Sequence, residues 1–385
     1  MGLMLGATSC TSAPSGSSSS PAAGESAGGA GGTRAAAPGA AASGGSQTSA
    51  EAPNGNLPLA GRAGSAGGAA DADAGTLLPT DAGAPRLAIR GVCWNPVRVG
   101  ATHPEGLDYL GFSDTDIPLM VELGVNVVRT YEPLLDRAVL DRLWAAGIRV
   151  IESVYPYGGV EASVVTERVR AVKDHPAVLY WALGNEWNYN GLYVGLSFED
   201  TLARLNEAAA LVRAEDATHP IATIYGELPT AETIAAMPDI DVWGINAYRG
   251  VSFGDLFDAW RALSDKPLFI AEYGADAYNA NLPGYDPQSQ ALATEALTRE
   301  ILERAAATSD AGIVLGGTIF EWADEWWKDA AGSLTEQEVG GIAPGGGPYP
   351  DQVFNEEWWG IVDIERVPRP AYERLRSVFS EFGAR

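Results

Sequence analysis

The segment VLYWALGNEW (178–187) joins a buried-strand composition to a polar end. Its first residues are apolar, aromatic or small without a break, and it closes with an amide and a carboxylic acid, Asn185 and Glu186. A continuous apolar run of this kind is typical of a strand that is buried on both faces, as in a parallel sheet. The segment therefore predicts a central strand with an Asn-Glu pair at its carboxyl end.

Seven further segments share this composition, and helical patterns such as 136–147, 199–216, 289–307 and 370–383 alternate with them. Eight strand–helix units in about 300 residues predict a (β/α)₈ TIM barrel over residues 86–385. The alternative is a doubly wound open sheet, which usually has a Gly-rich phosphate turn after its first strand, and GVCWNP is no such turn. The seven segments are RLAIRGVCWNP (86–96), VNVVRTYE (125–132), IRVIESVYPYG (148–158), PIATIYGE (220–227), IDVWGINAYRG (240–250), KPLFIAEYGAD (266–276) and GIVLGGTIFEW (312–322).

The region before residue 86 differs sharply from the rest of the chain. Residues 11–85 are mostly Ala, Gly, Ser, Pro and Thr without one aromatic residue, which predicts a disordered linker because little apolar surface is available for burial. Cys10 closes the run MGLMLGATSC, which resembles the end of a bacterial lipoprotein signal in which the cysteine is lipidated. We therefore expect an extracytoplasmic protein, lipid-anchored or secreted, whose contact with a membrane is limited to that anchor.

The charge and composition of the chain limit the classes of partner and cofactor that it is expected to bind. The formal net charge is −25, and a domain so acidic repels nucleic acid and anionic membranes but accommodates a neutral substrate. The two cysteines do not form a disulfide framework, and the three histidines show no metal-ligand spacing. We expect no metal and no cofactor, and we expect a monomer.

The carboxyl ends of the predicted strands carry acids, amides and aromatic rings. In a barrel of this kind the chemistry lies at that end of the strands. Glu186 on the fourth strand and Glu272 on the seventh lie on opposite sides of the ring, and two carboxyl groups that flank a bond are the equipment of glycoside hydrolysis. The candidate substrate-binding residues around them are Arg129, Asn185, Asn246, Tyr248, Trp94, Trp187, Glu321, Trp322 and Trp326.

Other interpretations exist for several of these residues. Glu321 also ends a strand and is an alternative second carboxylate, and Tyr248 could simply pack in the core. Trp94 and Trp187 could be core residues as well. The tryptophan pairs in the long loop of about 328–369 and just before it favour a substrate cleft, since aromatic faces stack on sugar rings and long connections are often functional.

The sequence is similar to clan A glycoside hydrolases. ALGNEWN and PLFIAEYGAD resemble the two signature segments of family 2 catalytic barrels, and NAYRG, FEWADEWWK and FNEEWWGI resemble bacterial barrels related to β-glucan hydrolases and glucanosyltransferases. The resemblance implies that Glu186 is the acid/base and Glu272 the nucleophile. The β-sandwich domains of family 2 have no counterpart in the linker upstream, which argues against exo-acting β-galactosidase or β-glucuronidase specificity.

The same resemblance implies the roles of four neighbours. Asn185 is expected to bond the sugar 2-hydroxyl, and Tyr248 to bond the nucleophile. Arg129 is expected to lie beneath the nucleophile, and Trp322 beneath the reacting sugar.

These observations together predict a retaining β-glycoside hydrolase acting on a β-glucan or a similar neutral polysaccharide or oligosaccharide. A glucanosyltransferase with the same site is one alternative. A non-catalytic glycan-binding lipoprotein on the same barrel is another.

Overall fold

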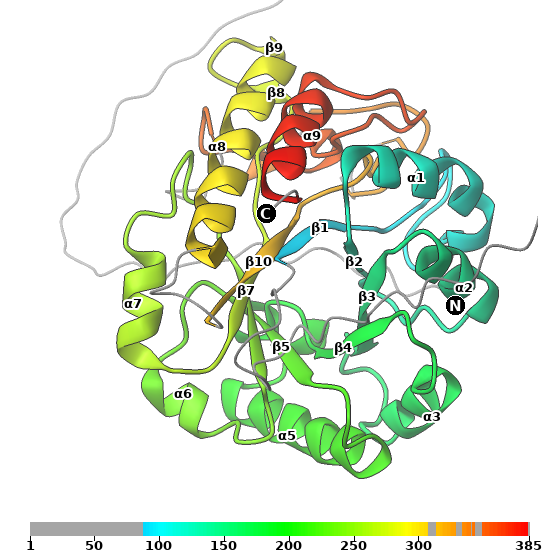
Figure 1. The fold of residues 1–385 in the computed structure, drawn as a ribbon, viewed down its shortest axis with the longest axis vertical. Coiled ribbons are helices and arrows are strands. Elements are labelled where there is room, and N and C mark those ends of the chain that lie inside the picture. Colours follow the sequence, from blue (N-terminus) through cyan, green and yellow to red (C-terminus); the bar gives the residue numbers. More distant parts are fainter. Residues whose placement is uncertain (1–87, 307–312, 329–332, 340, 343–348, 384–385) are drawn as a thin grey trace, which may run out of the picture. The chain divides into compact units, whose positions relative to one another are not determined.

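The computed structural model describes residues 88–306, 313–328, 333–339, 341–342 and 349–383, which form a closed parallel barrel surrounded by helices (Figure 1). Going round the barrel, the strand order is β1-β10-β7-β6-β5-β4-β3-β2, and β1 closes the ring by pairing with both β10 and β2. The predicted (β/α)₈ fold is confirmed.

Each barrel strand lies inside one of the eight predicted segments and is shorter than it, because the polar residues at the segment ends leave the sheet. The fourth strand, for example, ends two residues before Asn185. The barrel strands are β1 (Ile89–Cys93), β2 (Val127–Arg129), β3 (Arg149–Tyr155), β4 (Val178–Leu183), β5 (Ile221–Gly226), β6 (Val242–Asn246), β7 (Leu268–Glu272) and β10 (Val314–Ile319).

Two apolar layers explain why the strand segments are apolar without alternation. In β4, Tyr180 and Ala182 belong to the cluster inside the barrel, whereas Trp181 and Leu183 belong to the cluster between the barrel and its helices. All four side chains are buried. Successive side chains of a strand point to opposite faces, so both faces of such a strand must be apolar.

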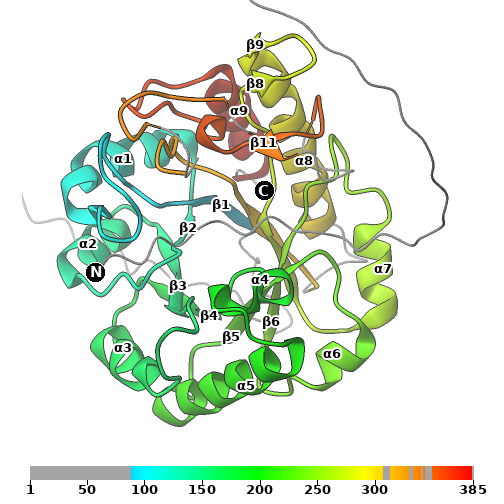
Figure 2. The same cartoon turned by 180° about the vertical axis from the view of Figure 1, so that it is seen from behind.

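The helices form the outer layer except for the short α4, which lies at the strand ends (Figures 1 and 2), and several begin at a polar side chain that accepts from their first backbone N–H groups. Asp108, Asp136 and Ser197 act in this way at α1, α2 and α5. The helices are α1 (Tyr109–Leu123), α2 (Arg137–Ala145), α3 (Val164–Val172), α4 (Trp187–Asn190), α5 (Phe198–Glu215), α6 (Ala231–Ala235), α7 (Leu256–Leu263), α8 (Pro287–Ala306) and α9 (Pro370–Gly383).

The connection between β10 and α9 is long and contains a buried bidentate ion pair. It contains β11 (Gly341–Ile342) and β12 (Phe354–Asn355), which pair with each other, and another short pair, β8 (Tyr278–Asn279) with β9 (Gly284–Tyr285), follows β7. Within the long connection, Arg369 donates from both terminal nitrogens to the two oxygens of Asp324, each at 2.6 Å.

We expect Asp324→Ala to destabilise the barrel by about 3–5 kcal/mol, because the guanidinium of Arg369 stays buried without its counter-charge. Equilibrium unfolding in urea measures this loss. As a matched control, Asp174→Ala removes an exposed bidentate ion pair with Arg137 and is expected to be close to neutral. Equal losses for the two variants would contradict the importance assigned to the buried pair.

Several sequence-based expectations lie outside the described residues. The signal-like run 1–10 with Cys10 and the linker 11–85 are among them. Within the described ranges, none of the helices has the length and apolar composition needed to cross a membrane.

Candidate active site

Glu272 ends β7 and is surrounded by three hydrogen-bond donors from the ends of two other strands, β2 and β6. Arg129, the last residue of β2, donates from Nη1 to its Oε1 at 2.8 Å. The hydroxyls of Tyr131 and Tyr248 donate to Oε1 and Oε2, both at 2.8 Å. Arg129 is fully buried, and Glu272 is 5% exposed. All three donors bond to the carboxylate anion, which is the form of the group that can act as a nucleophile.

Glu186 lies three residues beyond β4, in a backbone conformation that side chains rarely adopt. Its φ of 46° and ψ of 34° are left-handed, and the preceding Gly184 also has a positive φ, of 69°. Left-handed conformation costs a non-glycine residue about 1 kcal/mol or more and tends to occur at functional sites. The turn ends the apolar strand and starts α4, whose first backbone N–H groups at Tyr189 and Asn190 donate to the carbonyl of Glu186.

A chain of hydrogen bonds connects the two glutamates. Arg129, which binds Glu272, also donates from Nη2 to Asn185 Oδ1 at 2.6 Å. Asn246, the last residue of β6, donates from Nδ2 to Asn185 Oδ1 at 3.3 Å and to Glu186 Oε1 at 3.1 Å. Because Arg129 can only donate, Asn185 turns its oxygen toward Arg129 and its NH₂ group away. The strand ends therefore place both carboxyl groups in one network, as the sequence predicts.

The two glutamates differ in environment. Burial, and then the charge of Glu272, raises the pKa of Glu186 to about 7. The hydrogen bond that Asn246 donates to its carboxyl group opposes that shift only in part. Glu186 thus keeps a proton near neutral pH, whereas three donors stabilise the anion of Glu272. This asymmetry is what an acid and a nucleophile require.

Trp322 is not placed where the resemblance implied. It is 1% exposed and belongs to the layer between barrel and helices, where its ring centroid lies 6.5 Å from that of Tyr372 in α9. The aromatic ring beside the nucleophile is that of Phe320, two residues earlier, which packs edge-on against Tyr131 and Tyr248. Both residues lie beyond the end of β10, where strand alternation no longer fixes the direction of a side chain, and Phe320 rather than Trp322 faces the site.

Trp94 and Trp187 are also core residues, and the prediction that they bind substrate is wrong. Trp94 is fully buried and donates from Nε1 to Asp116 Oδ2 at 2.8 Å. Trp187 is 1% exposed, donates to Thr223 Oγ1 at 3.0 Å and packs edge-on against Tyr225. Each indole nitrogen has a partner inside the protein, so neither ring is available to a sugar.

Glu321 is buried beside another acid at the end of β10. Burial, and then the charge of Glu325, raises the pKa of Glu321 well above its ordinary value, which favours the protonated form of Glu321. Glu325 itself binds Lys328, whose Nζ lies 3.2 Å from Glu325 Oε2 and 3.5 Å from Glu356 Oε2. A protonated acid is a poor nucleophile, which argues against Glu321 as the second carboxylate. Trp326 is partly buried, with no hydrogen-bond partner for its Nε1 within the described part of the chain.

Four site residues were missed by the sequence analysis: Tyr131, Phe320, Tyr193 and Lys328. Tyr131 stands two positions after Arg129 in the second predicted strand segment. Residues two apart in a strand point to the same face, so this spacing was a usable signal. Tyr193 lies eight residues beyond Asn185, whose Nδ2 donates to its hydroxyl at 3.0 Å. No local pattern indicates that contact, because it depends on how the chain turns after β4.

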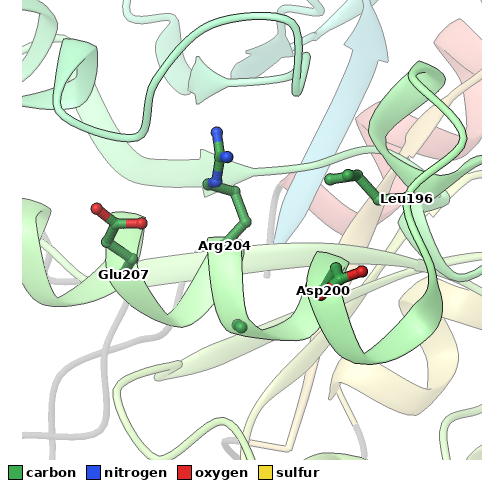
Figure 3. Close-up of a pocket in the computed structure, with 5 residues that line it drawn as sticks. Leu196, Asp200, Arg204 and Glu207 are labelled. Atoms are coloured by element: carbon green, nitrogen blue, oxygen red, sulfur yellow. The ribbon is translucent and has the colours of Figure 1, made fainter.

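A surface cavity of about 400 Å³ lies apart from these carboxylates, beside the first turns of α5 (Figure 3). Its lining residues are Leu196, Asp200, Ala203, Arg204 and Glu207. None of these five residues belongs to the hydrogen-bond network of Glu186 and Glu272 described above.

Comparisons with known proteins were made against families, curated sequences and solved structures. Residues 157–303 match the model of "Glycosyl hydrolases family 2, TIM barrel domain". The β-glucuronidase of Rattus norvegicus is 26% identical over 286 residues, which are 66% of this chain and 42% of the relative. That of Paenibacillus borealis is 24% identical over 234 residues, 57% of this chain and 34% of the relative. The chain thus spans less than half the length of these curated relatives.

Solved structures show the same fold at low sequence identity. A β-glucuronidase of Bacteroides uniformis has a TM-score of 0.53 and 20% identity, covering 76% of this chain and 35% of that one. A family 2 β-galacturonidase from Eisenbergiella tayi, bound to galacturonate, has a TM-score of 0.53 and 19% identity, covering 77% and 52%. The matched region begins just after β3 and contains both Glu186 and Glu272. Residues 157–303 of this chain therefore match a family 2 glycosyl hydrolase TIM barrel domain, as the two glutamate segments indicated.

Proposed function

We propose that the barrel is a retaining β-glycoside hydrolase that works by double displacement. The observation that carries this proposal is the contrast in hydrogen bonding between two carboxyl groups in one network. Glu272 is bonded by Arg129, Tyr131 and Tyr248, whereas Glu186 is buried with a pKa of about 7. The family 2 match over the region that holds both glutamates supports the same chemistry.

In the first step the carboxylate of Glu272 attacks the anomeric carbon while the bond to the leaving oxygen breaks. Glu186 gives its proton to that oxygen, so the leaving sugar departs as a neutral alcohol. Arg129 and Asn246 hold the two carboxyl groups in place. The negative charge of Glu272 is consumed as the covalent ester forms, and Glu186 becomes ionised.

In the second step Glu186 takes a proton from water, or from the hydroxyl of an acceptor sugar, and that oxygen attacks the anomeric carbon. The ester bond to Glu272 breaks and its carboxylate is regenerated. Two inversions retain the configuration. Water gives hydrolysis and an acceptor sugar gives glucanosyl transfer, so both outcomes use the same residues.

The charges around the site favour a neutral β-glucan as the substrate. Glu186, Glu272, Glu325 and Glu356 are acidic, and the two cations among the described site residues are already paired. Arg129 binds Glu272, and Lys328 lies between Glu325 and Glu356. The carboxylate of a uronic acid would add a further negative charge to these acidic surroundings. Such a like-charge contact is unfavourable in a poorly solvated site.

An acidic sugar is the second candidate substrate, and Lys328 is the observation that favours it. Its side chain is 24% exposed, and its charge is felt by Glu272 and by the hydroxyl of Tyr193. Relatives whose names are β-glucuronidase, and the galacturonate-bound structure, act on or bind acidic sugars. For Lys328 to receive such a carboxylate, it would have to give up Glu325 or Glu356.

We expect the wild-type protein to release products from a β-1,3-, β-1,4-, β-1,6- or mixed-linked glucan. We also expect 4-nitrophenyl β-glucoside to be cleaved at least about 100-fold more efficiently than the β-glucuronide, since one like-charge contact costs about 3 kcal/mol at short range. Mass spectrometry of the products and kcat/KM for the two aryl glycosides measure this. Products longer than the glucan oligosaccharide supplied would indicate transfer.

Glu186→Gln measured beside the wild type excludes a contaminating glycosidase, because only the wild type should give glucan products. Preference for the glucuronide would overturn the neutral substrate and favour the second candidate. Glucan binding without turnover of any glycoside would instead point to a glycan-binding protein.

The lipid-anchored or secreted location also remains a proposal, and it rests on Cys10 and the residues that flank it.

A further inference from the structure

The segment that follows Glu186 exposes an unusual concentration of large apolar side chains. Tyr189 is 53% exposed and Tyr193 is 48% exposed, and Val194 and Phe198 are each 39% exposed. All four fall within ten residues, between α4 and the start of α5. A soluble protein rarely clusters exposed aromatic side chains without a binding partner for them.

Tyr193 is held at the site by its hydroxyl and by its backbone. Its hydroxyl accepts from Asn185 Nδ2 at 3.0 Å. Burial, together with the charges of Glu186 and Glu272, raises the pKa of Tyr193 to about 12, so this hydroxyl lies within electrostatic reach of both carboxyl groups. Half of the residue is nevertheless exposed, so Tyr193 has its polar end in the network and offers part of its apolar surface to solvent.

The backbone around Tyr193 is strained, and strain of this kind tends to occur at functional sites. Leu192 and Tyr193 have φ values of 54° and 61°. Such left-handed residues persist only where surrounding contacts impose them. Leu192 supplies those contacts, because it is fully buried and its carbonyl accepts from Gly158 N at 3.0 Å.

Tyr189 is fixed at the carboxyl end of the neighbouring strand. Its ring lies against Gly226, the last residue of β5, where an added Cβ would come within 2.1 Å of the ring. The side chain of Asn188 forms two hydrogen bonds with the same glycine. It accepts from the N–H at 2.8 Å and donates to the carbonyl at 3.0 Å. Helix α4 thereby carries Tyr189 at the ends of β4 and β5 (Figure 2).

The roles of Glu186 and Glu272 in the reaction determine which part of a substrate these rings would contact. Glu186 protonates the leaving oxygen, so it lies on the leaving-group side of the bond, while Glu272 attacks the sugar that stays. Tyr189 is three residues beyond Glu186 and donates its backbone N–H to the carbonyl of Glu186 at 2.8 Å. The two tyrosines therefore extend the site from the acid rather than from the nucleophile.

We propose that Tyr189 and Tyr193 bind the sugar unit on the leaving-group side, which is also the unit that accepts the glycosyl group in transfer. The inference rests on the proposed double displacement. A pyranose ring presents a face of C–H groups that packs on an aromatic face, and this contact removes apolar area from water. An acceptor held in this way competes with water in the second step.

Two substrates separate this role from general damage to the site. β-Glucosyl fluoride has no sugar on the leaving side, whereas β-1,3- and β-1,4-linked glucotetraoses do. We expect Tyr189→Ala and Tyr193→Ala to lower the ratio of kcat/KM for the better tetraose to kcat/KM for the fluoride at least about tenfold. The ratio of transfer to hydrolysis products should fall with it.

Tyr193→Phe is the matched variant, since it keeps the ring and removes the hydroxyl bonded to Asn185. We expect it to lower kcat for both substrates but to leave their ratio within about twofold. Leu282→Ala removes an apolar side chain that is 73% exposed on the turn between β8 and β9, and serves as the surface control.

If the wild type cleaves both substrates and the alanine variants leave the ratio within twofold, the leaving-side role is overturned while the hydrolase stands. If the wild type cleaves neither substrate, the proposed function fails.

The tyrosines are then tested by titrating each tetraose against wild type and Tyr189→Ala with calorimetry. An equal Kd, or no binding to the wild type, overturns the role, and a Kd raised at least tenfold supports it.

Discussion

Glu272→Gln is expected to lower kcat by at least about 10⁴-fold on every glycoside that the wild type cleaves, because an amide cannot form the glycosyl ester. The fold should persist, since glutamine keeps one oxygen that can accept from Arg129 and Tyr131, as Oε1 of Glu272 does. Steady-state kinetics and thermal unfolding of the purified variant measure the two effects separately.

Glu272→Ala differs from the glutamine variant in a useful way. Both variants remove the negative charge beside the fully buried guanidinium of Arg129, but alanine also removes the oxygen that accepts its hydrogen bond, so we expect a lower Tm than in Glu272→Gln as well as lost activity. The alanine variant also leaves space for azide, which can attack the anomeric carbon from the same face, and the product would be the α-glycosyl azide. Recovered turnover with that product identifies Glu272 as the nucleophile.

Glu321→Gln is the control for this assignment, because Glu321 is the other acid at a neighbouring strand end. Its loss of activity should be far smaller, since a protonated acid and an amide both donate and accept hydrogen bonds. A loss of 10⁴-fold in Glu321→Gln, with residual activity in Glu272→Gln, would reverse the two roles.

Glu186→Gln is expected to lower kcat/KM by about 10²–10⁴-fold on glycosides with a sugar leaving group. The loss should be much smaller on 2,4-dinitrophenyl β-glucoside, because that leaving group departs as a stable anion and needs no proton. Comparing the two substrates in the same variant measures the contribution of acid catalysis. Equal losses on both substrates would contradict the role of Glu186 as the proton donor.

The pH profile gives a second and independent test of Glu186. The first step needs Glu186 protonated, and its pKa is raised to about 7. The wild-type kcat/KM on unactivated glycosides should therefore hold below pH 7 and fall about tenfold per pH unit above it. Glutamine does not titrate, so this alkaline limb should vanish in Glu186→Gln. An alkaline limb that remains at the same pH would assign it to another group.

The sequence by itself determined the barrel and the two glutamates. Eight uninterrupted apolar segments that alternate with helical patterns leave few arrangements other than a closed parallel sheet, because both faces of each strand must be covered. A parallel barrel brings all carboxyl strand ends to one side, so Asn185, Glu186 and Glu272 had to lie there together. Those placements follow from topology alone and need no side-chain geometry.

The tertiary structure alone decided which aromatic rings reach the site. Alternation predicts the direction of a side chain only while the chain is a strand, and Phe320, Trp322 and Tyr193 all lie beyond strand ends. Trp322 is buried toward α9, whereas Phe320 packs on the tyrosines that bond the nucleophile. Tyr193 reaches Asn185 because two left-handed residues turn the chain back, and such a turn depends on packing of Leu192 that no local pattern encodes.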